Sequence, residues 1–266
     1  MKKLLLSAFV ICLAGTSIAQ ESPLWMRHCA LSPDGTTIAF TYKGDIYTVP
    51  STGGRATQIT TNPAFDTEPV WSPDSKQIAF ASDRMGSLDV FVVSSEGGAP
   101  QRLTTHSGSE KPVAYKDNKH ILFTANIAPS AEDAGFPSSQ FQQVYEVAVT
   151  GGRPAMFSSM PMECISINKE GVMLYQDKKG YEDYWRKHQV SPIARDIWTY
   201  TPGKKPVYQK QTTFGGEDRE PVWSPDGKSF YYLSEEKGSF NIFQRTPGTT
   251  TSQQITFHTK HPVRFL

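Results

Sequence analysis

The sequence predicts an all-β protein, a β-propeller of four-stranded blades. Three observations lead to this fold: a turn motif recurs five times, each copy lies between two strand-like runs, and Gly-Gly or Pro-Gly pairs punctuate most units. Successive turns are 40 to 56 residues apart, and four short strands in such a length are typical of a propeller blade. The 20 glycines and 19 prolines agree with many tight turns rather than helices.

The recurring turn has the pattern Ser-Pro-Asp-Gly. Pro presets φ at the first turn position, while Asp and then Gly or Asn tolerate the left-handed conformation that closes a hairpin. We therefore interpret the tetrapeptide as turn chemistry, not as a catalytic motif, even where longer stretches repeat as EPVWSPDSKQIAF and EPVWSPDGKSFYY. The aligned copies are Ser32-Pro33-Asp34-Gly35, Ser72-Pro73-Asp74-Ser75, Tyr115-Lys116-Asp117-Asn118, Asn168-Lys169-Glu170-Gly171 and Ser224-Pro225-Asp226-Gly227.

Three further strands follow the innermost one in each unit. The second is a short apolar run that predicts burial on both faces, as in Ile38-Ala39-Phe40 and Ile78-Ala79-Phe80. The third opens with a polar residue that we expect to bind local backbone amides, at Asp45, Asp89, Gln143, Asp196 and Asn241. The fourth is more polar and ends in Thr, as in Gln58-Ile59-Thr60-Thr61, Arg102-Leu103-Thr104-Thr105, Gln211-Thr212-Thr213 and Gln254-Ile255-Thr256.

The chain opens with the features of a secretory signal peptide. Lys2 and Lys3 precede an apolar run that ends near Gly15, and small residues precede a predicted cleavage after Ala19. No later stretch approaches the roughly 20 apolar residues that a membrane span requires. Residues 1–19 are therefore predicted to be removed, and the mature protein is expected in the periplasm or outside the cell.

The repeat predicts that residues 20–266 of the mature chain form one partial propeller. Its blades are predicted at about 24–62, 63–107, 108–160, 161–215 and 216–260. The run His261-Pro262-Val263 repeats the pattern of Glu220-Pro221-Val222, so 261–266 are expected to start a sixth blade. An unfinished ring leaves unpaired strand edges, and we expect this chain to be part of a longer protein.

Composition excludes several classes of function. A formal charge of +1 with mixed acids and bases gives no basic stripe for nucleic acid. Cys29 and Cys164 are expected to be buried thiols rather than a bridge, and the six histidines lie outside any catalytic motif. The acids of Asp66-x-Glu68 and Glu217-Asp218-x-Glu220 could face Ca²⁺, but we interpret them as solvated or turn-capping. No catalytic residue, metal or cofactor is predicted.

Two insertions depart from the minimal repeat. One runs from about Asn126 to Gln142 in blade three and the other from about Gln176 to Arg195 in blade four, both between the second and third strands. They should lie on one face of the ring, where binding loops are usually built. The aromatic and basic residues of the second suit peptide binding or docking of a neighbouring domain, with docking preferred; they are Tyr181, Tyr184, Trp185, Arg186, Lys187 and His188.

One long passage resembles a known family. The segments Tyr181 to His188, Ala194-Arg195-Asp196-Ile197-Trp198 and Phe214 to Pro221 are similar to the N-terminal propeller of bacterial tricorn-like serine proteases, and the repeat looks like that of TolB. The resemblance implies a PDZ-like domain and a peptidase core elsewhere in the parent, peptide or unfolded-protein substrates, and assembly into a homo-oligomer. The alternatives are a stand-alone TolB-like binding propeller and the propeller of a prolyl-oligopeptidase-type enzyme, although no Gly-x-Ser-x-Gly elbow occurs here.

Overall fold

The computed structural model describes residues 25–127, 141–181, 183, 185, 188 and 190–266. The signal peptide predicted at 1–19 and most of the blade-three insertion therefore lie outside the described residues. The described residues form 20 β-strands in five antiparallel sheets of four strands each. They contain no helix, and hence none that could cross a membrane.

Each sheet is a meander in chain order. Blade one contains β1 (Arg27–Leu31), β2 (Thr37–Tyr42), β3 (Asp45–Pro50) and β4 (Thr57–Gln58). Blade two contains β5 (Asp66–Trp71), β6 (Gln77–Ser82), β7 (Asp89–Ser94) and β8 (Gln101–Arg102). Blade three contains β9 (Lys111–Asp117), β10 (His120–Ala125), β11 (Gln143–Ala148) and β12 (Ala155–Ser158). Blade four contains β13 (Met162–Ile167), β14 (Met173–Asp177), β15 (Ile197–Thr201) and β16 (Val207–Lys210), and blade five contains β17 (Asp218–Trp223), β18 (Phe230–Ser234), β19 (Asn241–Arg245) and β20 (Ser252–Gln254).

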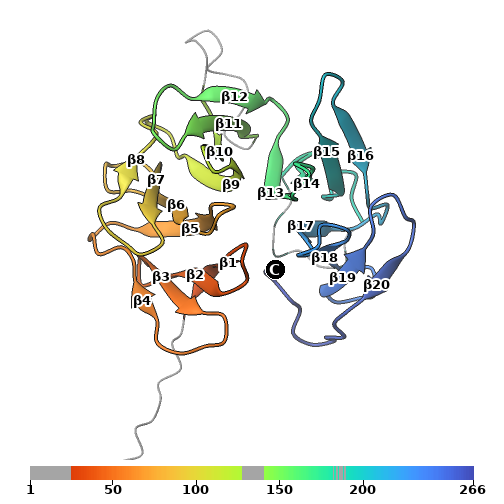
Figure 1. The fold of residues 1–266 in the computed structure, drawn as a ribbon. Coiled ribbons are helices and arrows are strands. Elements are labelled where there is room, and N and C mark those ends of the chain that lie inside the picture. Colours follow the sequence, from red (N-terminus) through yellow and green to blue (C-terminus); the bar gives the residue numbers. More distant parts are fainter. Residues whose placement is uncertain (1–24, 128–140, 182, 184, 186–187, 189) are drawn as a thin grey trace, which may run out of the picture.

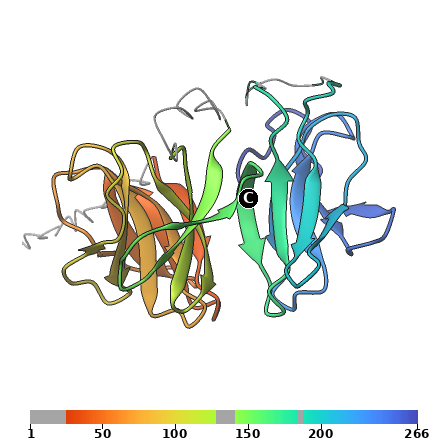
Figure 2. The same ribbon diagram turned by 90° about the horizontal axis from the view of Figure 1, so that it is seen from above.

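The five sheets stand around a common centre, which confirms the predicted β-propeller (Figure 1). The first strand of each blade lies nearest the centre, and the described ends of the two insertions lie on the same side of the ring (Figure 2). The C-terminal residue also lies near the centre. Residues 262–266 form no strand, but the backbone N–H of Val263 donates to the Phe240 carbonyl at 3.0 Å. In the same way, the backbone N–H of Asp66 donates to the Gly44 carbonyl and that of Glu110 to the Leu88 carbonyl, where the chain enters the inner strands of blades two and three.

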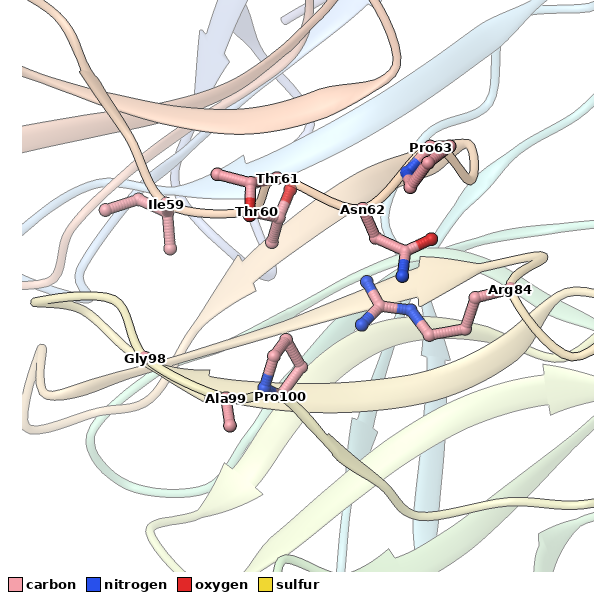
Figure 3. Close-up of a pocket in the computed structure, with 9 residues that line it drawn as sticks. All are labelled: Ile59, Thr60, Thr61, Asn62, Pro63, Arg84, Gly98, Ala99 and Pro100. Atoms are coloured by element: carbon pink, nitrogen blue, oxygen red, sulfur yellow. The ribbon is translucent and has the colours of Figure 1, made fainter.

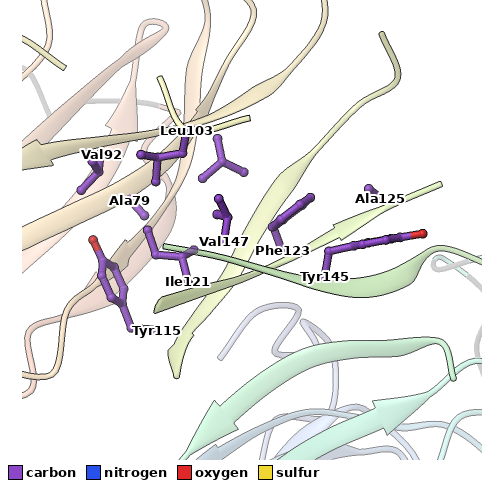
Figure 4. Close-up of a cluster of buried hydrophobic side chains, with 10 residues drawn as sticks. Ala79, Val92, Leu103, Tyr115, Ile121, Phe123, Ala125, Tyr145 and Val147 are labelled. Atoms are coloured by element: carbon purple, nitrogen blue, oxygen red, sulfur yellow. The ribbon is translucent and has the colours of Figure 1, made fainter. Parts of the chain in front are cut away.

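Buried apolar clusters hold neighbouring blades together. Between blades two and three, Ala79 and Leu103 pack against Ile121, Phe123 and Tyr145 (Figure 4). Similar clusters join blades one and two, three and four, and four and five. A second strand contacts both neighbours, which explains why its consecutive residues are apolar: Ile121, Leu122 and Phe123 are all fully buried. Within the described residues, no such cluster joins blade five to blade one.

The Ser-Pro-Asp-Gly turns form as predicted. Ser32 donates its hydroxyl to Asp34 at 2.6 Å and accepts the N–H of Thr37 at 3.0 Å. Ser72 and Ser224 make the equivalent pair of bonds, and the fourth turn residue takes positive φ at Gly35, Ser75 and Gly227. The Ser hydroxyl and one Asp oxygen of each motif are thus used in closing the turn, which supports the structural interpretation.

Contrary to the prediction, the polar residue at the start of the third strand does not bind local backbone amides. Asp45 accepts from the Thr60 hydroxyl and the Gln58 amide, both on the fourth-strand side of its own blade. The Thr in turn accepts the backbone N–H at the start of the third strand, from Ile46 to Thr60 at 2.9 Å. The prediction was wrong because the fourth strand ends at Gln58, and the side chain of Thr60, two residues later, points towards the start of the third strand. Thr104, Thr212 and Thr256 accept the same bond in their blades.

Candidate functional site

A cavity of about 1290 Å³ occupies the centre of the ring. All five inner strands contribute to its wall, and much of the lining is apolar, including Val70, Val113, Ile165 and Val222. The cavity also extends between blades five and one, where Ile242 of blade five lines it on one side and Ile38 of blade one on the other. This is the pair of blades that no buried cluster of the described residues joins, so the open seam and the central space form one volume.

Four inner strands contain the same β-bulge, and the bulge residue of each lines the cavity. The strand register shifts at this point, and the bulge residues have left-handed φ values: His28 at 51°, Glu68 at 55°, Cys164 at 52° and Glu220 at 53°. In blade three the equivalent position is Pro112, whose ring holds φ negative. A non-glycine residue with positive φ is unusual, and four at one repeat position mark a feature of the blade rather than an accident.

The bulge explains the Glu of the repeated EPVW stretch. Glu68 binds the Lys111 ammonium of the next inner strand at 2.6 Å, and Glu220 accepts the backbone N–H of Leu266 at 2.8 Å. Each carboxylate thus reaches from its own blade to the segment that follows that blade on the cavity wall. The Trp of the stretch points the other way: the Trp71 indole N–H donates to the Ala30 carbonyl of the preceding blade at 2.9 Å.

The wall contains further charged groups that are paired. Glu163 of blade four binds Lys178 at 2.8 Å and Arg195 at 3.4 Å, and Arg195 also binds Glu217 at 3.2 Å. Burial raises the pKa of Glu217 against the opposing effect of Arg195. Because the wall residues Glu68 and Glu163 each face a cation, the wall offers both signs of charge close to apolar surface.

Both cysteines line this cavity as free thiols. They are unbridged, as predicted, but the prediction that they are buried was wrong: both are exposed to the cavity because the inner strands turn their bulge segments towards the centre. Cys164 opens onto the cavity and is enclosed by protein on its other sides, and this burial raises the pKa of its thiol. Burial also lowers the pKa of His28, with Glu68 opposing the shift. Burial raises the pKa of the Cys29 thiol as well, so both thiols are protonated and His28 is neutral near pH 7.

The described part of the chain contains no recognisable catalytic centre. No described histidine forms a hydrogen bond with a serine or cysteine hydroxyl or thiol; His120, for example, binds Asp117 and His106 binds the Gly108 amide. In the same residues no three His, Cys, Asp or Glu side chains gather as metal ligands. Of the acids considered as Ca²⁺ ligands, Asp66 binds Arg84 at 2.9 Å, Glu68 binds Lys111 and Glu217 binds Arg195, whereas Glu220 accepts a backbone N–H and Asp218 is buried.

Among the aromatic and basic residues predicted in the blade-four insertion, the described ones, Tyr181, Trp185 and His188, are outside the lining of the central cavity. Tyr184, Arg186 and Lys187 lie outside the described residues. Tyr181 and Trp185 are 72% and 64% exposed, and the Trp185 ring lies 5.2 Å from the Arg264 guanidinium. The backbone N–H of His188 donates to Glu235 of blade five at 2.7 Å. The described residues of this insertion therefore contact blade five and the segment after it, and a role in binding stays a prediction.

A smaller cavity of about 320 Å³ lies on the rim between blades one and two. The linker Thr60 to Pro63 forms one side and Gly98 to Pro100 the other, with Arg84 between them (Figure 3). Arg84 binds both carboxylate oxygens of Asp66 and stacks 4.6 Å from the Phe91 ring centre. Its charge is thus already used within the protein, which makes the rim cavity a poor candidate for an anion site.

Comparison with known proteins places these features in a family. Tricorn protease homolog 1 of Streptomyces coelicolor is 39% identical over 213 residues, which is 79% of this chain but 19% of that protein, so the chain spans about a fifth of this relative. The crystal structure of the tricorn protease matches 91% of this chain and 23% of its own with a TM-score of 0.72 at 17% identity. A putative TolB from Agrobacterium tumefaciens matches 88% of this chain and 81% of its own, with a TM-score of 0.68 at 14% identity. The family model described as the tricorn protease N-terminal β-propeller domain matches residues 23–266, and the chain therefore belongs to that family.

Proposed function

We propose that this chain is the non-catalytic propeller of an exported tricorn-like serine protease, where it binds or guides peptides through its central cavity. The observation that carries the proposal is the cavity itself, placed in a chain whose family is that of the tricorn N-terminal propeller. The catalytic residues would belong to other parts of the parent protein, such as the PDZ-like and peptidase domains that the resemblance implies.

The chemistry of the wall supports a peptide as ligand. An extended peptide presents apolar side chains together with backbone N–H and C=O groups, and it needs partners for both. Val70 and Val222 supply apolar surface, while the Glu220 carboxylate already accepts one backbone N–H, that of Leu266. Paired charges such as Lys111 and Glu68 avoid a single strong sign of charge, which suits ligands of varied sequence.

Assembly is the second part of the proposal. The described residues of the blade-four insertion extend beyond the minimal blade and expose Tyr181 and Trp185 on one face of the ring. Exposed aromatic residues on such a face suit docking of a neighbouring domain or subunit. Export to the periplasm or the outside remains part of this proposal, because the predicted signal peptide lies outside the described residues.

A bulky side chain in the cavity tests the peptide proposal. Val222 lines the cavity and is 40% exposed, so Val222→Trp would project into the cavity and should weaken binding of a fluorescein-labelled unstructured peptide at least tenfold in an anisotropy titration. Val207 on β16 is 56% exposed and outside the cavity lining, and Val207→Trp is the matched control that should leave binding unchanged. Equal binding by both variants, or no binding by the unaltered protein, would refute the proposal.

A TolB-like binding propeller without peptidase partners is the second candidate. Its support is the match to the putative TolB, which covers most of both chains. The two candidates differ in what accompanies the propeller in the gene: a PDZ-like segment and a processing-peptidase core favour the first, and a propeller with neither favours the second. A Gly-x-Ser-x-Gly module would favour a prolyl-oligopeptidase-type parent instead.

A further inference from the structure

Pairs of acidic residues lie at three junctions between blades, at the start of an inner strand. The backbone N–H of Asp66 donates to the Gly44 carbonyl at 2.7 Å, that of Glu110 to the Leu88 carbonyl at 2.7 Å, and that of Asp218 to the Arg195 carbonyl at 3.1 Å. Each acceptor is followed directly by an acid at the start of the third strand of the previous blade: Asp45, Asp89 or Asp196. This bond sets Asp66 near Asp45, Glu110 near Asp89 and Asp218 near Asp196. At the junction of blades three and four, these positions are Gln143 and Met162, which carry no charge.

The junctions differ in how much positive charge reaches the acid on the inner strand. Asp66 is fully buried, and the Arg84 guanidinium binds both of its oxygens at 3.0 and 2.9 Å. At the next junction, Arg102 binds Asp89 at 2.9 Å, and not Glu110. In the junction of blades four and five, Lys179 and Lys210 both bind Asp196, and not Asp218.

Glu110 and Asp218 are therefore buried acids without a direct cation at their oxygens. Glu110 is 0% and Asp218 1% exposed, and neither carboxyl has a hydrogen-bond partner of normal geometry within the described residues. Asp89, the Thr104 hydroxyl and the His106 backbone face Glu110. The Thr212 and Ser234 hydroxyls, Asp196 and Glu236 face Asp218. A buried carboxylate beside a second one is unfavourable, whereas a carboxylic acid can donate a hydrogen bond.

We propose that Glu110 and Asp218 carry a proton in the folded protein near neutral pH, which makes these two blade junctions sensitive to pH. The burial of both groups and the neighbouring carboxylates support this. Burial raises the pKa of each to about 7, with Asp89 adding to the effect at Glu110 and Asp196 at Asp218. The proposed export would expose the chain to the pH outside the cytoplasm, where a rise towards and through about 7 would ionise both acids and loosen the ring at two of its four packed junctions.

The sign of the pH dependence follows from linkage. Each acid has a higher pKa in the folded than in the unfolded chain, so its stabilising effect is complete below the unfolded pKa and is lost as pH rises through the folded one. Between those two pH values, each group lowers the folding constant by up to tenfold per pH unit. The two groups together would give up to a hundredfold per unit, before other groups contribute.

The test measures urea unfolding of the unaltered chain, Glu110→Gln, Asp218→Asn and the double variant between pH 5 and 8.5. We expect the folding constant of the unaltered chain to fall from pH 5 to about 7 and the contribution of these acids to level off above that, each single variant to remove up to tenfold per unit from the slope, and the double variant to remove both contributions. Asp66→Asn is the matched control at the cation-paired junction and should leave the slope in place. Carboxyl ¹³C NMR of the unaltered chain gives an independent result: midpoints near 7 for Glu110 and Asp218 support the proposal, and midpoints below about 5 or an unchanged slope in the double variant would overturn it.

Discussion

The bulge on the cavity wall gives the sharpest prediction about stability, and Cys164 is the best place to test it. Its φ of 52° lies in the left-handed region, where an L-residue is strained by roughly 1–2 kcal/mol and glycine is not. Its thiol opens onto the cavity and forms no disulfide. Cys164→Ala and Cys164→Gly both remove this thiol, so a comparison of the two variants reports mainly the backbone preference.

We expect Cys164→Gly to be more stable than Cys164→Ala by about 1 kcal/mol, since alanine keeps the strain and glycine removes it, less the extra entropy that glycine loses on folding. The measurement is the free energy of unfolding in urea, followed by tryptophan fluorescence. Ala30 on the first inner strand has no positive φ, and Ala30→Gly is the control: it should lower stability by about 0.5–1 kcal/mol. A glycine at position 164 that is no better than alanine would refute the assignment of strain to the bulge.

Two further changes test the packing and the charges. Phe123 is fully buried between blades two and three, and Phe123→Ala should cost about 3–5 kcal/mol, whereas Phe257→Ala, at a side chain that is 75% exposed, should change the free energy of unfolding by less than about 0.5 kcal/mol. Arg195→Met leaves Glu163 and Glu217 without their shared cation and should cost about 3–5 kcal/mol at pH 8. Because burial raises the pKa of Glu217, acid neutralises that side chain more readily, and the loss at Arg195→Met should be smaller at pH 5. A loss that is small and independent of pH would contradict this account of Arg195.

Most of the propeller could be predicted because its signals are local. A turn such as Ser32 to Gly35 closes through hydrogen bonds among residues at most five positions apart, so the motif itself specifies the hairpin. The apolar run Ile121 to Phe123 likewise reports its own burial, since a strand covered on both faces needs apolar side chains in succession. Five repetitions of these short patterns were sufficient to predict the blades and their order.

The partners of individual polar residues could not be predicted, because they come from other blades or from distant parts of the same blade. Asp45 has the same appearance in the sequence as a local cap, yet it binds Thr60, which is 15 residues away. Glu68 and Glu220 look alike in identical EPVW stretches, but one binds a lysine side chain and the other a backbone amide. No pattern in the chain distinguishes them, since each partner is supplied by the segment that follows the blade.

The sequence by itself determined the all-β repeat, the turn chemistry and the apolar second strands, which depend on interactions within a few residues. Only the tertiary structure revealed the central cavity, the shared left-handed bulge at Cys164 and its equivalents, and the free thiols on the cavity wall. The physical reason is that a cavity is formed by inner strands of separate blades. Whether a side chain such as Cys164 is buried or faces that space depends on a bulge that moves it by one register position, and a bulge of this kind has no fixed sequence signature.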